Sequence, residues 1–209
     1  MSILIYAESA EGKIKKVAFE LASYAKKVAA SMGTTVTAVT INNSDNSALA
    51  AYGVDKVLNV SNDKLNNFSA KAYADVIAQA AKKEGTQIVL VSSSTDSLYL
   101  APLVAVALEA GYASNVVALP ESTSPFQVKR TAFSNKAFNI TEISTPVKVL
   151  GIAKNSFGLV ESPSSLTEES FAPSLNDADF GIKVESVEKV TGKVTIADAE
   201  IVVSAGRGM

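Results

Sequence analysis

The sequence predicts an α/β fold built on a doubly wound, mostly parallel sheet. Over residues 1 to about 120, short apolar or β-branched runs alternate with segments that have helical spacing of apolar residues. The run at 87–93, QIVLVSS, is apolar almost without interruption, as a strand covered on both faces requires. Glycines follow the helical segments, where helices commonly end. These three observations together favour strands covered by helices on both faces.

The elements of this region follow from the same patterns. Strands are expected at residues 2–7, 34–41, 56–60, 87–93 and 114–119. Helices are expected between Gly12 and Gly33, at 47–53, from Ser69 to about Lys83, and at 97–111. The segment 97–111 is apolar nearly all round, so we expect it to be a sheltered helix in which Pro102 is tolerable only near the first turns.

The pattern changes after Pro125. Residues 126–133 and 138–144 alternate between apolar and polar side chains and are joined by a polar turn, which predicts an antiparallel β-hairpin. A buried strand, a long polar connection that could wrap another surface, and a second alternating segment follow at 147–153, 154–180 and 182–190. The predicted fold is therefore Rossmann-like, of the adenine-nucleotide-hydrolase kind, with an added antiparallel β-hairpin.

Charge and hydropathy exclude several classes of partner. Nineteen Lys and Arg residues stand against 21 Asp and Glu, a net charge of -2, so we expect no nucleic-acid partner. The longest apolar stretch, 98–108, is well short of the roughly 20 residues of a membrane helix. The acidic amino terminus does not resemble a signal peptide. We therefore expect a cytoplasmic protein that is not embedded in a membrane.

The chain has no Cys and no His. This removes disulfides, thiolate nucleophiles, histidine-based triads and the usual zinc sites. No convincing pair of catalytic carboxylates replaces them. We therefore expect no catalytic residues, no metal site and no enzyme acting alone.

The last residues, AEIVVSAGRGM at 199–209, read as an apolar strand followed by a glycine-flanked turn. In open α/β sheets, glycines just past a strand let the backbone approach a phosphate, although a plain turn has the same pattern. No helix follows in this sequence. We expect residues 1–190 to form an amino-terminal α/β scaffold domain and residues 191–209 to be the first strand and turn of a truncated second domain.

Five stretches together resemble the α-subunit of the electron transfer flavoprotein family. They are ILIYAES (3–9), AAYGVDKV (50–57), the segment 91–116, VKR (128–130) and AEIVVSAGRGM (199–209). The last is the most specific, and the resemblance covers the whole chain. One departure is Asn135 in the hairpin turn, where the family usually has a glycine; Asn accepts the left-handed conformation well.

The resemblance implies a heterodimeric FAD carrier of the kind that serves fatty acid β-oxidation. Its α-subunit has an amino-terminal domain without cofactor and a carboxy-terminal FAD-binding domain, while the β-subunit holds AMP. Electrons pass from acyl-CoA dehydrogenases and related dehydrogenases to the FAD and then to a membrane quinone oxidoreductase. Gly206, Arg207 and Gly208 match the FAD-contacting turn, in the intact protein only, so a chain ending at Met209 is not expected to hold FAD. Arg130 matches the hairpin arginine, a possible contact to the flavin or to a partner, although a surface arginine is equally ordinary.

Two groups of polar residues keep two interpretations each. Residues 92–96, SSSTD, lie at the carboxyl end of a strand and predict either an anion or nucleotide site or simple helix capping. Lys13, Lys15 and Lys16 suit either a phosphate site or a solvated helix face, and no complete phosphate-loop fingerprint accompanies them. The rival function is a stand-alone sensor module of the same fold that binds AMP or ATP at the 92–97 loop.

Overall fold

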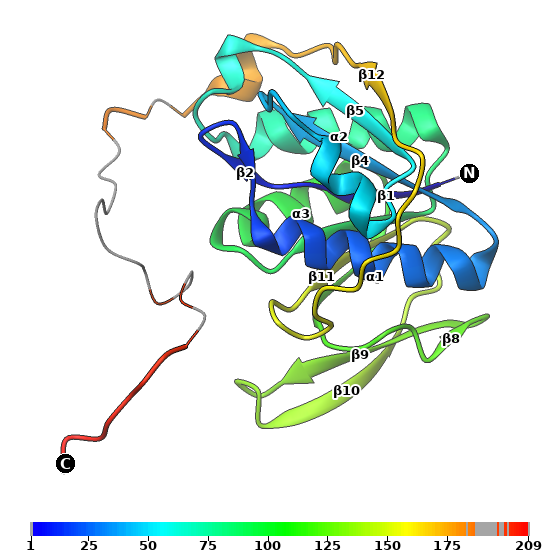
Figure 1. Ribbon diagram of the computed structural model, residues 1–209, viewed down its shortest axis with the longest axis vertical. Helices are drawn as coiled ribbons and strands as arrows, with labels where there is room; N and C mark the ends of the chain where they lie inside the picture. Colours follow the sequence, from blue (N-terminus) through cyan, green and yellow to red (C-terminus); the bar gives the residue numbers. More distant parts are fainter. Residues whose placement is uncertain (1, 183, 187–195, 197–198, 200, 209) are drawn as a thin grey trace.

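The computed structural model describes residues 2–182, 184–186, 196, 199 and 201–208. Its main sheet has the strand order β10-β9-β7-β11-β6-β1-β4-β5-β12 (Figure 1). The parallel strands are β1 (Ser2–Tyr6), β4 (Thr35–Ile41), β5 (Lys56–Val60), β6 (Ile88–Ser92), β7 (Gly111–Val116), β11 (Lys148–Ile152) and β12 (Thr167–Ser170). The antiparallel strands are β8 (Ser122–Thr123), β9 (Phe126–Ala132) and β10 (Ala137–Glu142), and β2 (Ser9–Ala10) pairs separately with β3 (Lys13–Ile14).

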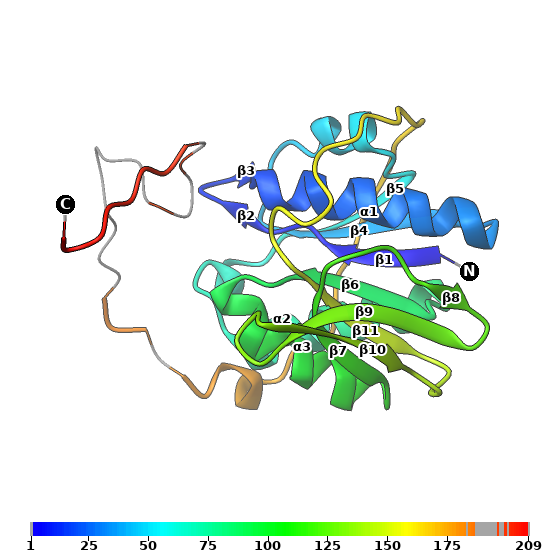
Figure 2. The ribbon, with the colours of Figure 1, turned by 90° about the horizontal axis from the view of Figure 1, so that it is seen from below.

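Helices cover both faces of this sheet, which confirms the predicted doubly wound α/β fold. The helix α1 (Lys16–Met32) and the 3-10 helix η1 (Ser47–Tyr52) lie on one face, and α2 (Ala70–Glu84) and α3 (Thr95–Ala107) lie on the other (Figure 2). Two apolar clusters fill the two layers, one built around α1 and the other around α2 and α3. The strands β1, β4 and β6 are buried nearly throughout because they contribute side chains to both clusters.

The expected helix ends are confirmed in three places. Gly53 ends η1 in the left-handed region, with φ of +89°. Gly33 ends α1 in the left-handed region, with φ of +63°, and its N–H donates to the carbonyl of Ala29. Gly85 ends α2 in the same way. Ser69 holds the backbone position that precedes α2, but its hydroxyl donates to the carbonyl of Asp179 at 2.8 Å rather than capping the helix. The short helix η2 (Asp63–Leu65) was not expected.

The structure corrects the prediction of a helix at 97–111, which is α3. It spans Thr95–Ala107 rather than 97–111, and it contains Pro102 in its interior. It is not sheltered, because Tyr99 and Val106 are 68% and 77% exposed. Its inner face alone packs on the sheet, and no described element covers its outer face. The strand after it accordingly begins earlier than expected, at Gly111, which pairs with Lys148 of β11.

The predicted hairpin is confirmed, and it extends the sheet. β9 and β10 pair from Ala132↔Ala137 outward, and the turn between them has positive φ at Phe133, Ser134 and Asn135. β9 joins β7 through the pair Val116↔Arg130. Asn135 is therefore one of three left-handed residues in this turn.

The polar connection at 154–180 wraps this domain rather than another surface. β12 lies parallel to β5 at the edge of the sheet, and the short helix η3 (Asp177–Phe180) follows it (Figure 1). Glu169 on β12 forms ion pairs of 2.8 Å with both Lys56 and Lys83. Most of the expected alternating segment 182–190 and the domain boundary at 190 lie outside the described residues, and 184–186 have no strand structure.

Candidate functional site

The sheet places a crevice between the carboxyl ends of β1 and β6. These strands are parallel neighbours, with Ile3 opposite Ile88 and Ile5 opposite Leu90. The chain leaves β1 toward α1 on one face and leaves β6 toward α3 on the other, so the two connections diverge at this point (Figure 2). Such a switch point is where open α/β sheets usually bind their ligands, phosphates in particular.

Glu8 occupies this crevice. The residue is 3% exposed, and its Oε1 accepts hydrogen bonds from the hydroxyls of three serines. Ser94 Oγ donates to it at 2.7 Å and Ser97 Oγ at 3.0 Å, and Ser92 Oγ is the third donor. All three serines are buried. Because an ionised carboxylate only accepts hydrogen bonds, this cluster of donors is matched to a negative charge.

The first turn of α3 completes the surroundings of this carboxylate. Ser94 is the N-cap of α3, and its Oγ accepts the N–H of Ser97 at 3.1 Å. The amino end of a helix carries partial positive charge and favours a nearby anion. On the other side, Lys15 Nζ lies 3.5 Å from Glu8 Oε2, with its own side chain 42% exposed. Hydroxyls, the helix end and an exposed lysine thus surround a single carboxylate.

Burial and nearby negative charges change the pKa of Tyr6 at the end of β1. Its pKa is raised well above the ordinary value, chiefly by burial. Tyr73 and the negative charges of Glu8 and Asp96 raise it further. Tyr6 therefore stays a neutral phenol at physiological pH.

A second carboxylate, that of Glu20 on α1, fixes the loop after β11. Its Oε1 accepts the backbone N–H groups of Phe157 at 2.9 Å and Gly158 at 3.1 Å, and its Oε2 accepts that of Asn155 at 2.9 Å. Glu20 is 6% exposed. Asn155 and Gly158 have φ of +57° and +85°, and left-handed residues of this kind turn successive N–H groups toward one point. The loop is thus an anion-binding concavity that contains a side chain of the same protein.

A cavity of about 820 Å³ adjoins both carboxylates. Its lining includes Glu8 and Glu20 on the inside and Lys15, Lys16 and Lys154 around them. Its volume is in the range of small-molecule sites. The described residues contain no group of His, Cys, Asp and Glu that could hold a metal ion.

The structure decides between the interpretations of 92–96. Helix capping is confirmed for Ser94. The hydroxyls of Ser92 and Ser94 also donate hydrogen bonds to an anion, and this anion is the side chain of Glu8, not a ligand. Ser93 is separate, since its buried Oγ has no hydrogen-bond partner among the described residues and it lines a neighbouring cavity of about 560 Å³. Thr95 and Asp96 open α3 and line the larger cavity.

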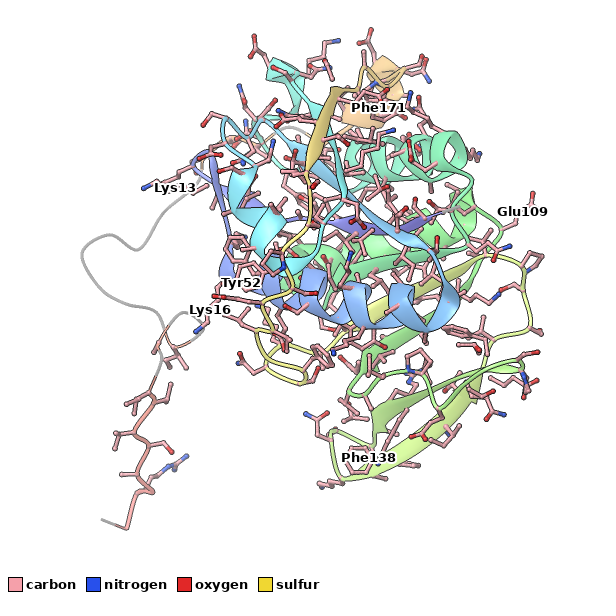
Figure 3. All side chains as sticks on the ribbon, turned by 45° about the vertical axis from the view of Figure 1, so that its right-hand side comes forward. Lys13, Lys16, Tyr52, Glu109, Phe138 and Phe171 are labelled. Carbon is pink, nitrogen blue, oxygen red and sulfur yellow. The ribbon has the colours of Figure 1, made fainter. Side chains whose placement is uncertain are left out.

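The lysines of the first helix region are mostly solvated. Lys13, Lys15 and Lys16 are exposed, and Lys13 points outward from the molecule (Figure 3). Only Lys15 approaches an anion, which again is Glu8. The interpretation as a solvated face therefore holds for Lys13 and in part for Lys15.

Arg130 lies on β9 and turns toward its own domain. Its Nη2 donates to Ser114 Oγ at 3.2 Å, and the side chain is half-buried. It also lies close enough to Tyr112 to lower the pKa of that phenol in part, against the larger effect of burial, which raises it. A contact from Arg130 to flavin or to a partner remains a prediction.

Gly206, Arg207 and Gly208 are exposed, and residues 201–208 form neither helix nor strand. A Cβ added at Gly206 or Gly208 would meet nothing within 4 Å, so neither glycine is required here by a close backbone approach. These three residues alone do not form a pocket that fits FAD. Their contact with FAD in a longer protein remains a prediction.

Glu8 and Glu20 were not singled out as site residues by the sequence analysis. The available signal for Glu8 was its position, directly after the first buried strand and, through the topology, opposite the serine-rich end of another strand. Glu20 gave no such signal, because an acidic residue in a helix is ordinary and the loop that it binds lies 135 residues further along the chain.

No helix in the described part of the chain has the length and apolar character to cross a membrane.

Residues 3–176 match the family model described as the electron transfer flavoprotein domain. The chain is 28% identical to the electron transfer flavoprotein subunit alpha of Thermoanaerobacterium thermosaccharolyticum and 29% identical to that of Megasphaera elsdenii. Each comparison covers 99% of this chain and 65% or 64% of the relative, so the chain spans slightly less than two thirds of their length. It is also 26% identical, over 99% of its length and 51% of the relative, to the lactate dehydrogenase (NAD(+),ferredoxin) subunit LctC of Acetobacterium woodii.

Proposed function

The chain belongs to the electron transfer flavoprotein family, and on this premise we propose that it is the amino-terminal scaffold part of an alpha subunit that carries electrons on FAD. The family match runs from the first strand to the end of the polar connection. The similar alpha subunits are about half as long again as this chain, which leaves room for a further domain. In this proposal residues 1–190 are the scaffold and residues 191–209 begin the FAD-binding domain.

The observation that carries the proposal is that the carboxylate of Glu8 occupies the crevice at the ends of β1 and β6. The fold has the architecture of a nucleotide-binding domain, but Glu8 accepts the three serine hydroxyls at the end of β6 and the start of α3 that would otherwise meet a phosphate. A domain of this kind is suited to support a cofactor bound elsewhere. It is less suited to bind a nucleotide of its own.

In the longer protein, the turn at 206–208 would lie against FAD. The guanidinium of Arg207 is planar and always charged, and it suits a pyrophosphate or an electron-rich flavin edge through paired hydrogen bonds. FAD, when bound, supplies the redox chemistry, and the protein supplies binding and orientation. Arg130 is a candidate contact to the flavin or to the partner subunit.

The proposed partner is a beta subunit that holds AMP. As electron donors we propose acyl-CoA dehydrogenases and related dehydrogenases, and as acceptor a membrane quinone oxidoreductase. The relative that is a lactate dehydrogenase subunit supports keeping the donor class wider than acyl-CoA dehydrogenases alone. The proposed location is the cytoplasm.

A stand-alone sensor that binds AMP or ATP is the second candidate function. It depends on free donors in the 92–97 loop, and three of the four serines there, Ser92, Ser94 and Ser97, donate to Glu8, while Ser93 Oγ has no partner among the described residues. Micromolar binding of AMP or ATP by the 209-residue chain in isothermal calorimetry would support this candidate. It would contradict the scaffold proposal.

The first experiment is to isolate the gene's product from its native cells and to measure its intact mass, its absorbance and its companions. The scaffold proposal predicts a mass more than about 10 kDa above the 21.8 kDa of this chain, the increment of a further domain of about 100 residues. It also predicts flavin absorbance and an equimolar second subunit. A product of 21.8 kDa without flavin or a second subunit would overturn the proposal.

A further inference from the structure

We infer that Glu8 is a built-in anion that fills the phosphate position of a nucleotide-type crevice, and that its removal exposes a binding site for phosphomonoesters. This inference concerns the described domain alone and does not depend on the proposed function. Its evidence is the set of donors around one carboxylate and the cavity beside it.

The donors around Glu8 have the composition of a phosphate site. Three buried hydroxyls converge on Oε1, and the amino end of α3 lies behind them. Such donors bind phosphate at the switch point of open α/β sheets. Asp96 in the first turn of α3 also lines the cavity, but Glu8 is the carboxylate that accepts the three hydroxyls. Here the negative charge comes from the strand side of the same crevice, from the residue two positions after β1.

A carboxylate in this position excludes a phosphate in two ways. It occupies the space in front of the serine hydroxyls, and it repels a second anion at close range in a buried setting. Both effects are local to Glu8, because its side chain is almost completely enclosed. Glu20 occupies the neighbouring anion-binding loop in the same way, because its two carboxylate oxygens accept the three N–H groups that the loop turns inward.

The cavity provides room for the remainder of a ligand. It adjoins Glu8 and Ser94 and has a volume of about 820 Å³, enough for a nucleoside monophosphate. Its lining combines the apolar side chains of Val17 and Leu159 with the cations of Lys15, Lys16 and Lys154. These side chains offer apolar surface for a base and positive charge for a phosphate, and the carboxylates of Glu20 and Asp96 line the cavity beside them.

The test compares four forms of the 209-residue chain: wild type, Glu8→Ala, Glu8→Gln and Glu84→Ala. Glu8→Ala removes both the volume and the charge. Glu8→Gln removes the charge and keeps the volume. Glu84→Ala is the matched control, because it also removes one negative charge but does so at the far end of α2, where Glu84 pairs with Lys56 at 2.9 Å.

The probes are inorganic phosphate and AMP, with chloride at equal ionic strength as reference. We expect Glu8→Ala to bind AMP at least about tenfold more tightly than wild type in isothermal calorimetry, since one or two charge-assisted hydrogen bonds suffice for that factor. We also expect its melting temperature to rise by roughly 5 °C in phosphate at a large excess over Kd. Wild type, Glu8→Gln and Glu84→Ala should show neither effect.

Two outcomes of the binding experiment overturn the inference. Equal binding of AMP and phosphate by wild type and Glu8→Ala would mean that Glu8 does not exclude the phosphate group. Equal binding by Glu8→Gln and Glu8→Ala means that the side chain does not occupy it. If Glu8→Ala fails to fold, Glu8→Ser is the second variant. If neither folds in chloride, recovery of the folded circular dichroism spectrum in phosphate supports the inference, and failure to recover overturns it. Preference for AMP over inorganic phosphate would place the nucleoside in the cavity, and no preference would confine the site to the phosphate group.

Discussion

The substitution Glu20→Ala is expected to release the loop after β11 and to destabilise the domain measurably. Glu20 is a buried residue of α1, and its carboxylate accepts three backbone N–H groups from residues 155–158 at 2.9 to 3.1 Å. The loop has no other contact of this kind to α1 except the pair between Ser23 and Val160 in the described structure. The carboxylate is therefore the principal polar connection between the helix and this loop.

The expected magnitude follows from the number and setting of these bonds. Hydrogen bonds to a charged group contribute about 1.5–3 kcal/mol each when both partners stay buried. Asn155 and Gly158 are exposed residues, so water can reach their N–H groups once the carboxylate is gone. Alanine also gains a few tenths of a kcal/mol in helix propensity. We therefore expect Glu20→Ala to lower the free energy of unfolding by about 2–4 kcal/mol, well below the sum of three full bonds.

Glu20→Gln separates the charge from the geometry. Its amide oxygen still accepts the N–H groups of Phe157 and Gly158, but its NH₂ group would face the N–H of Asn155. One bond is lost and two become neutral, so we expect a loss of about 1–2 kcal/mol. Urea denaturation followed by circular dichroism measures both variants. Glu121→Ala is the control, because Glu121 is exposed and a surface change of this kind stays within about 0.5 kcal/mol.

Amide hydrogen exchange makes the test specific for this loop. In Glu20→Ala the three amides at 155, 157 and 158 should exchange at least about tenfold faster, while the amides of β6 keep their rates. The reasoning would be refuted by a Glu20→Ala variant as stable as the control. It would also be refuted by a destabilised variant whose three loop amides retain their protection.

Three further predictions concern the sheet edge at β12, the start of β7 and the carboxyl end of the chain. Hydrogen bonds from two lysines lower the pKa of Glu169 to about 2, so its contribution to docking β12 is complete above the unfolded value of 4.5 and is lost as pH falls toward 2. Hydrogen exchange of β12 between pH 4.5 and 2 should show this edge opening before the rest of the sheet, and simultaneous opening would contradict the prediction. Gly111→Ala should destabilise by about 1–3 kcal/mol, since its Cβ would lie 2.5 Å from Cγ2 of Ile143, whereas Gly206→Ala should leave the urea midpoint unchanged. In the full-length flavoprotein, Arg207→Ala should weaken FAD retention by about 10- to 100-fold, the value of one or two charge-assisted bonds, and unchanged retention would remove Arg207 from the cofactor site.

The sheet and its helices could be predicted because their signals are local. The buried run at 87–93, the helical spacing after Gly12 and the stops at Gly33 and Gly85 each depend on neighbouring residues only. The exposure of α3 could not be predicted, because an apolar outer face looks the same in sequence whether or not another element covers it. The course of 154–180 was missed for a similar reason, since β12 pairs with β5 between residues more than 100 positions apart, with an ion pair from Lys56 to Glu169 beside them.

The candidate site shows where such local reasoning ends. Residues 92–96 kept two interpretations, an anion or nucleotide site and helix capping, and the structure shows an element of each, since Ser94 caps α3 and the hydroxyls of Ser92 and Ser94, with that of Ser97, donate to an anion. The sequence pattern could not indicate whether this anion is a ligand or a side chain, because that depends on which strand lies next to β6 in the sheet. β6 pairs with β1, which is 82 or more residues earlier in the chain, and only that pairing brings Glu8 to the serines.

The two buried carboxylates also explain why this crevice differs from a binding site while keeping its shape. A phosphate-type position left with donors alone would bury hydroxyls and N–H groups without acceptors, which costs free energy. A ligand can satisfy them, and so can a carboxylate from the same chain. Glu8 accepts the hydroxyls of Ser92, Ser94 and Ser97, and Glu20 accepts three N–H groups of the loop after β11, so these donors are satisfied without any bound nucleotide. A rigid domain whose stability is independent of ligand concentration is what a scaffold for a cofactor held elsewhere requires.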